Sequence, residues 1–521
     1  MVRSAALACG LCLTVTGSAA ARTQQQEAQP LTIEEATIAE IHAEMEAGRL
    51  TASQLVEHYL RRIQAYDKRG PAINAIIMVN PRARDRAYEL DRAFADSGFI
   101  GPLHGIPVIV KDNYDTHDLP TTGGSLSLQG SIPPNDAYQV RKLREAGAIV
   151  LAKSNMAEFA FSPYHTVGSV LPGHTRNPYA LNRVPAGSSG GTGAAVASNF
   201  GMVGIGTDTG NSIRGPSSHN LLVGIRSTMG LTSRDGIIPL YLDRDIGGPM
   251  ARTVADAVAV LDVIAGFDPA DPVTADSRGR TEESYAEFLR ADGLNGARIG
   301  VLRQISNTET ADPEILRRFE EALDVMRREG AVVIDPVRIP EQDDIPRGAR
   351  WCPRFRTDIN AYLASLGPDA PVRSLGDIIR SGRFHPSIRS SLQRFMGIDE
   401  PPEQNAACQR ADANRRLLRA GVRRVLAQHD LDAMVYPTWS NPPRLIGDLN
   451  TPHGDNSQDL APHTGFPAIT VPMGFVYDGL PTGLQILGDA WSEPTLIAIA
   501  YSYEQATKHR RPPPTVPRLP R

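Results

Sequence analysis

Hydrophobic residues follow two different spacings along this chain, and each spacing predicts a different kind of element. Leu55, Tyr59 and Ile63 recur at intervals of four residues, which is typical of the buried face of a helix. Uninterrupted apolar runs at 106–110 and 148–152 are instead typical of buried strands, and we expect the second strand to extend over 148–153, to Lys153. A helical pattern lies between these two runs. The resulting order of strand, helix and strand predicts an α/β protein.

Polar residues that can cap the free N–H groups of a first turn mark the helix starts. Thr32 with Glu35 and Thr51 with Gln54 both have the spacing of a capping box. We therefore expect helices to begin at both places. The same patterns predict further helices at 81–95, 136–146, 253–264, 313–329, 417–429 and 493–507, and further strands at 72–79, 202–205, 298–302, 332–334, 433–436 and 468–471.

Two stretches show neither pattern. Residues 340–412 are rich in proline, arginine and serine, and we expect them to form an irregular cap that shapes a substrate pocket. The final residues, 511–521, contain five prolines and are expected to be frayed.

Composition narrows the class of protein. The chain has 521 residues, of which 41% are hydrophobic, and a net charge of −4. These values fit a soluble globular protein of one large domain or two, and the absence of a basic excess predicts no nucleic-acid partner. Only five of the 54 basic residues are lysines. We expect one or two of these lysines to have a chemical role, although nucleotide composition explains an arginine bias equally well.

The first 21 residues have the order of a secretory signal peptide. An early arginine precedes a short apolar run and a small-residue end, and the run is too short to span a membrane as a helix. We therefore expect a secreted or periplasmic protein without a membrane span. Removal of this signal peptide would leave Cys352 and Cys408 as the cysteines of the chain. They could pair in an oxidising compartment or remain free and buried.

Residues 184–218 carry the candidate chemistry. They contain the motifs GSSGG at 187–191 and DTGNSIRGP at 208–216. Glycine allows tight turns that bring backbone N–H groups close to a ligand, and a serine among such groups can attack a carbonyl whose oxyanion they stabilise. Lys111 follows the predicted strand at 106–110, at the end where open α/β sheets place ligands. The pattern indicates a nucleophile site.

Together with PLHGIPVIVKDN at 102–113, these motifs resemble the amidase signature family. The spacing of 24 residues between Ser188 and Ser212 is similar as well, and the resemblance extends to FPAITVPMGF and GLPTGLQILG within 466–488. It implies a single α/β domain over 27–510, with a catalytic core at about 100–265. The family fold is a large twisted mixed β-sheet covered by helices on both faces.

The resemblance also assigns roles to residues. It implies that Lys111 is the base, that Ser188 relays a proton after a cis peptide bond from Gly187, and that Ser212 is the nucleophile. The relay requires neutral Lys111, with a pKa about three units below its ordinary value of about 10.4, a shift that arginine could not make. The implied oxyanion hole consists of the backbone N–H groups of Thr209, Gly210, Asn211 and Ser212.

The implied function is that of an amidohydrolase, which cleaves a carboxylic amide through a serine acyl-enzyme. We expect a small-molecule amide as substrate, no cofactor or metal, and a possible homodimer. Aliphatic, aryl and peptide amides and carbamates all remain open as substrates.

Four residues close to the proposed catalytic residues have supporting roles or depart from the family pattern. Asp208 and Arg214 flank the nucleophile, and we expect an ion pair that holds its loop. Ser189 either donates a hydrogen bond in the site or completes the turn. Asn211 stands where the family usually has glycine, and its side chain either narrows the acyl site or adds a polar contact.

Three alternatives remain open. Ser189 is also the centre of a G-x-S-x-G motif, which would make the chain an α/β-hydrolase with His463 as the best-placed catalytic histidine. That motif needs a strand directly before it, and the two prolines of NPYALNRVPA disfavour one. The chain could also be the amidase subunit of a tRNA-dependent amidotransferase, for which an export signal is unsuitable, or a non-catalytic binding protein on the same scaffold.

Overall fold

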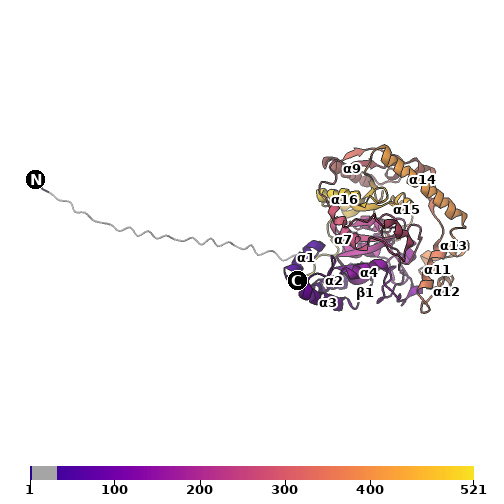
Figure 1. The fold of residues 1–521 in the computed structure, drawn as a ribbon, viewed down its shortest axis with the longest axis horizontal. Helices are drawn as coiled ribbons and strands as arrows, with labels where there is room; N and C mark the ends of the chain where they lie inside the picture. Colours follow the sequence, from indigo (N-terminus) through magenta and orange to yellow (C-terminus); the bar gives the residue numbers. More distant parts are fainter. Residues whose placement is uncertain (3–31, 521) are drawn as a thin grey trace. The chain divides into compact units, whose positions relative to one another are not determined.

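An 11-stranded mixed sheet runs through the unit that begins at Ile33. The structure is a computed structural model that describes residues 1–2 and 32–520 (Figure 1). The strand order is β1-β3-β2-β4-β6-β5-β10-β11-β9-β7-β8. The strands are β1 (Ile76–Val79), β2 (Pro107–Lys111), β3 (Ile149–Ser154), β4 (Val203–Asp208), β5 (Val223–Arg226), β6 (Ile246–Ala251), β7 (Arg298–Val301), β8 (Val332–Ile334), β9 (Ala433–Pro437), β10 (Ala468–Val476) and β11 (Leu480–Leu487).

Parallel pairing occurs at two places in this sheet. Strand β2 pairs in parallel with β3 and β4, and β7 pairs in parallel with β8 and β9, whereas the remaining pairs are antiparallel. The parallel strands β2 and β4 both end at the same edge of the sheet, where they place Lys111 and Asp208. The predicted α/β class and mixed sheet are confirmed.

Helices cover both faces of the sheet (Figure 1). They are α1 (Ile38–Glu46), α2 (Ala52–Tyr66), α3 (Ala83–Ser97), α4 (Tyr138–Glu145), α5 (Gly190–Ala197), α6 (Arg214–His219), α7 (Val254–Ile264), α8 (Arg303–Ser306), α9 (Pro313–Arg328), α10 (Pro340–Asp344), α11 (Phe355–Ser365), α12 (Leu375–Ser381), α13 (Arg389–Met396), α14 (Ala406–Gln428), α15 (Ala461–Thr464) and α16 (Glu493–Thr507). Among the described residues, no helix combines the length and the apolar character that a membrane crossing needs. The predicted signal peptide lies, apart from Met1 and Val2, outside the described residues.

One of the two predicted capping boxes is confirmed and the other is wrong. Thr51 and Gln54 cap α2 reciprocally, as predicted. The first helix begins later than Thr32, because Thr37 and Glu40 form the capping box that precedes α1. Thr37 stands directly before Ile38, the first buried apolar residue of that helix, whereas Thr32 precedes a turn.

We expected residues 340–412 to be irregular, and this expectation is wrong, because the region is largely helical. It contains α10 to α13 and the start of α14, joined by short 3-10 turns. Buried side chains such as Phe355, Ile359, Leu392 and Phe395 pack in one cluster with Phe159. The helices were missed because α10 to α13 are short and are separated by segments that contain proline, which obscure the periodicity.

The expectation of a frayed tail at 511–521 is also wrong for the part that the structure describes. Val516 is buried, and the Arg62 guanidinium on α2 donates hydrogen bonds to the carbonyls of Val516 and Pro517 at 3.0 Å each. Thr515 Oγ1 donates to the Pro178 carbonyl. A buried guanidinium needs acceptors for its five N–H groups, and the tail supplies two of them.

Cys352 and Cys408, whose pairing the sequence left open, form a disulfide that connects the segment before α11 to the first turn of α14. Both cysteines are buried with Ala411. The bond therefore attaches one end of the 340–412 region to its other end.

Replacing both cysteines with alanine is expected to lower the free energy of unfolding by about 4 kcal/mol, because the bond joins residues 56 positions apart and restricts the unfolded chain. Urea unfolding followed by tryptophan fluorescence measures this change. A double variant that unfolds at the same urea concentration as the oxidised wild type would contradict the expectation.

Candidate active site

The three residues to which the family resemblance assigns catalytic roles come from three separate segments. Lys111 is the last residue of β2, Ser188 lies just before α5, and Ser212 lies in the loop between β4 and α6. Lys111 Nζ lies 2.7 Å from Ser188 Oγ and 2.7 Å from Thr207 Oγ1. The first link of the predicted relay, from lysine to serine, is therefore at hydrogen-bonding distance.

Lys111 occupies a site that disfavours its charge. Complete burial lowers the pKa of Lys111 to about 7, and this loss of hydration outweighs the opposite effect of the Asp208 and Asp245 carboxylates. A pKa near 7 leaves a large neutral fraction at physiological pH, so the amine can accept a proton.

Two residues around Lys111 were not predicted from the sequence. Thr207 Oγ1 accepts a hydrogen bond from Lys111 and another, at 3.0 Å, from Asn113 Nδ2. Asn113 belongs to the same KDN segment as the lysine, and a search for polar residues near the strand end could have found it. Thr207 lies inside a buried strand, where threonine is a common residue, so no feature of the sequence distinguishes it.

The GSSGG segment is packed too tightly for larger residues. The Gly187–Ser188 peptide bond is cis, as the resemblance implied. A Cβ atom at Gly187 would lie 2.4 Å from the Ser162 carbonyl oxygen, and one at Gly191 would lie 2.1 Å from the Asn155 carbonyl oxygen. Both glycines are therefore required by close approach of the backbone.

Ser189 joins this segment to the adjacent strand. Its hydroxyl donates to the Thr207 carbonyl at 3.2 Å and accepts from the Thr207 N–H at 3.3 Å. Its own N–H donates to the Ser212 carbonyl at 3.3 Å. Of the two roles that the sequence allowed, these contacts favour a structural one, which keeps the two serine segments together.

Asp208 anchors the loop that carries Ser212. Arg214 Nε donates to Asp208 Oδ2 at 3.1 Å, and Arg226 Nη1 donates to Asp208 Oδ1 at 2.9 Å. Burial alone would raise the pKa of Asp208, but the two guanidinium groups outweigh burial and hold it at about 2. The expected ion pair with Arg214 is present, and Arg226 extends it to a buried network that the sequence did not reveal.

The loop after Asp208 presents backbone donors to the cavity. Among the hydrogen bonds between described residues, none is donated by the N–H groups of Thr209, Gly210, Asn211 or Ser212. Arg214 Nη2 donates to the Gly210 carbonyl at 2.7 Å, which fixes the loop from behind. Free N–H groups on a fixed loop meet the requirement for an oxyanion hole.

A cavity of about 470 Å³ opens above this loop. Its floor includes the four loop residues, whereas neither Lys111 nor Ser188 lines the cavity. Much of its wall is aromatic or aliphatic, from Phe161, Leu240, Tyr241, Trp351, Pro353 and Phe395. Part of this wall, including Trp351 and Phe395, belongs to the 340–412 region.

The α/β-hydrolase alternative does not fit this geometry. No strand immediately precedes Ser189, since the described residues 178–187 form turns and isolated bridges. The Ser189 hydroxyl is bonded to the backbone of β4, as described above. His463 Nδ1 instead lies 2.7 Å from Arg244 Nη1, and burial lowers the pKa of this histidine well below its ordinary value.

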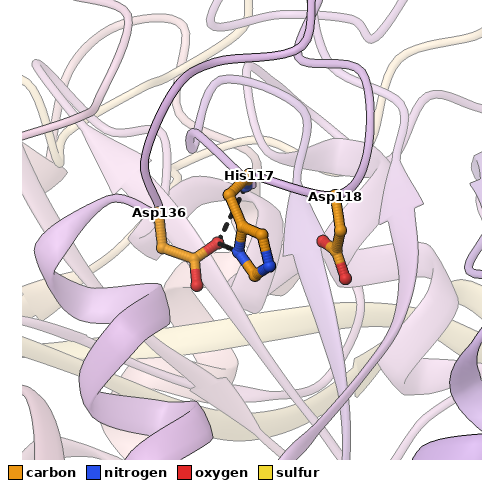
Figure 2. A group of neighbouring side chains, drawn as sticks. All are labelled: His117, Asp118 and Asp136. Carbon is orange, nitrogen blue, oxygen red and sulfur yellow. Dashed lines mark hydrogen bonds and ion pairs between the residues drawn. The ribbon is translucent and has the colours of Figure 1, made fainter.

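A separate group of His117, Asp118 and Asp136 has side chains close enough to hold a metal ion (Figure 2). His117 Nδ1 lies 3.0 Å from Asp136 Oδ1. Arg144 already pairs with both carboxylates, at 2.6 Å from Asp118 and 3.1 Å from Asp136. The contacts of this group are those of a surface ion-pair network.

Comparison with known proteins agrees with the fold and with the family resemblance. The Amidase family model matches residues 54–497. The chain is 35% identical to a probable amidase of Arabidopsis thaliana over 519 residues, which cover 95% of this chain and 94% of the plant protein. It is 34% identical to a putative amidase of Schizosaccharomyces pombe over 527 residues, covering 93% of this chain and 87% of the yeast protein.

A solved structure is also similar. Native peptide amidase from Stenotrophomonas maltophilia matches with a TM-score of 0.84 and 40% identity, over 92% of this chain and 98% of that chain. A mixed sheet of this topology with a buried lysine against the GSSGG segment thus defines an amidase signature hydrolase. This chain belongs to the Amidase family, and it is an amidohydrolase that cleaves carboxylic amide bonds.

Replacing Asp208 with asparagine should lower the free energy of unfolding by roughly 3–5 kcal/mol, because two buried guanidinium groups would lose their carboxylate. Urea unfolding followed by circular dichroism measures the loss. Asp324→Asn is the matched control, since Asp324 pairs with Arg327 at 2.8 Å on the exposed surface of α9. Equal unfolding midpoints for the two variants would contradict the role of Asp208.

Proposed function

We propose that Ser212 is the nucleophile of this amidase, Ser188 the proton relay and Lys111 the base. The observation that carries this assignment is the 2.7 Å contact between the buried Lys111 amine and Ser188 Oγ. It is supported by the lowered pKa of Lys111 and by the free N–H groups beside Ser212.

The proposed reaction has two halves. In the first, Ser212 Oγ forms a bond to the amide carbonyl carbon while its proton passes through Ser188 to Lys111. The N–H groups of residues 209–212 stabilise the oxyanion, and the proton then moves to the leaving nitrogen as the C–N bond breaks. In the second half, water bonds to the acyl carbon while its proton passes through Ser188 to Lys111. The proton then moves to Ser212 Oγ as the ester bond breaks and the carboxylic acid is released.

We further propose a substrate that carries an aromatic or bulky apolar side chain near the scissile amide. The aromatic wall of the cavity supports this class, because aromatic rings pack well against one another. The similar structure from Stenotrophomonas maltophilia is that of a peptide amidase, so amidated peptides with a C-terminal aromatic residue are the first substrates to test. A screen in which only small aliphatic amides react would oppose this choice.

Export to the periplasm or the cell exterior remains a proposal based on residues 1–21. The disulfide supports it, since such bonds persist in oxidising compartments. N-terminal sequencing of the protein purified from its native host tests it, and an intact Met1 would count against cleavage.

A homodimer also remains a prediction, which sedimentation velocity tests.

The catalytic rate should follow the protonation of Lys111. Because the base must be neutral and its pKa is about 7, kcat/KM for an amide should rise about tenfold per pH unit below pH 7 and level off above it. A profile that is flat or falling between pH 5 and 7 would contradict the assignment. Lys111→Arg is the control, since arginine keeps the charge but cannot become neutral, and it should be inactive across the whole range.

A fluorophosphonate should label Ser212, and peptide mass spectrometry locates the label. In Lys111→Ala the labelling rate should fall by about 10²–10⁴-fold, which is the usual contribution of a general base. A label on Ser189 that forms at the same rate in both proteins would overturn the proposed roles.

A further inference from the structure

Asn211, which stands where the family usually has glycine, contacts the proposed nucleophile directly. Its side chain is nearly fully buried and forms part of the cavity floor. Asn211 Nδ2 donates to the Pro163 carbonyl at 3.4 Å, while Asn211 Oδ1 accepts from Ser212 Oγ at 3.3 Å. The Pro163 carbonyl thus sets the orientation of the carboxamide, so that its oxygen faces Ser212.

The surrounding backbone makes room for this carboxamide. A Cβ atom at Gly215 would lie 2.6 Å from Asn211 Nδ2. The absence of a side chain at Gly215 therefore allows the asparagine to fit behind the nucleophile. Larger residues at both positions could not be accommodated together without movement of α6.

The contact with Ser212 cannot persist through the reaction. Among the described residues, the Ser212 hydroxyl is the one donor found to Asn211 Oδ1. When Ser212 passes its proton toward Ser188, it stops donating to the asparagine. Asn211 Oδ1 is then a buried acceptor without a donor, which is unfavourable unless the substrate supplies one.

We propose that the N–H of the scissile amide takes the place of the Ser212 hydroxyl at Asn211 Oδ1, so that Asn211 selects amides over esters of the same acid. An ester presents an oxygen lone pair to this acceptor instead of a hydrogen. Sites that pair with a substrate N–H reject analogues that lack it, because their own polar group is left unpaired. The inference rests on the proposed role of Ser212.

The proton balance of acylation is unchanged by this contact. The Ser212 Oγ to carbonyl carbon bond forms, the C–N bond breaks, and the proton lost by Ser212 arrives on the leaving nitrogen through Ser188 and Lys111. The hydrogen that contacts Asn211 stays on that nitrogen throughout. Asn211 therefore acts as a specificity-determining residue and exchanges no proton.

The test compares N-acetyl-phenylalanine amide with its methyl ester in wild type, Asn211→Ala and Asn211→Gly. We expect kcat/KM for the amide to fall at least about tenfold more than kcat/KM for the ester in both variants, so that the amide-to-ester ratio falls about tenfold or more. Asn211→Gly carries the usual family residue, so it keeps the test valid if the alanine variant does not fold. Equal changes for amide and ester would overturn the inference.

Gln458→Ala is the matched control, because Gln458 is another carboxamide of the same cavity, beside Gly210 and without a contact to Ser212. It should change both substrates by the same factor. Ser212→Ala separates this inference from the proposed function. If Ser212→Ala still hydrolyses the amide, the nucleophile is wrongly assigned and the inference falls with it. If that variant is inactive while the Asn211 variants keep the wild-type ratio, only the role of Asn211 is overturned.

Discussion

The buried charge of Asp208 is the constraint on which the catalytic arrangement depends. A carboxylate without exposure to water must be paired, and Asp208 meets this need with guanidinium groups from α6 and β5. The same carboxylate accepts from the N–H of Ile213 at 3.2 Å. The loop between Asp208 and Ile213 is thereby fixed at both ends. Its N–H groups take no part in the hydrogen bonds of a helix or strand, so they are available to a ligand.

The end of β4 serves both halves of the site. Thr207 accepts from Lys111, and the next residue, Asp208, holds the nucleophile loop. Asp245 connects the same loop to the cavity wall, because it accepts from Thr209 Oγ1 and from the backbone of Leu240. One strand end therefore sets the relative positions of base, nucleophile and substrate wall, and the low polarity of the surrounding sheet lowers the pKa of the lysine.

The sequence predicted elements with strong periodicity and motifs with unusual residues, and it missed features that depend on distant contacts. Helix α16 was predicted from a helical spacing of apolar residues, and the strand at Lys111 was predicted from an uninterrupted apolar run. The 340–412 helices were missed because their apolar positions become meaningful only when Phe355 and Phe395 meet in space. Arg226 and Thr207 could not be identified from sequence, since arginine and threonine are common and only the fold brings them to Asp208 and Lys111.

The contact between Arg62 and the end of the chain constrains the order in which the protein can be completed. Arg62 lies on the second helix, yet its guanidinium needs the carbonyls of Ser198, Asn199, Val516 and Pro517. Val516 and Pro517 are made 454 and 455 positions after Arg62. The buried guanidinium on α2 therefore acquires these two acceptors only after synthesis has passed residue 517, so an early helix of the unit stays incomplete until then.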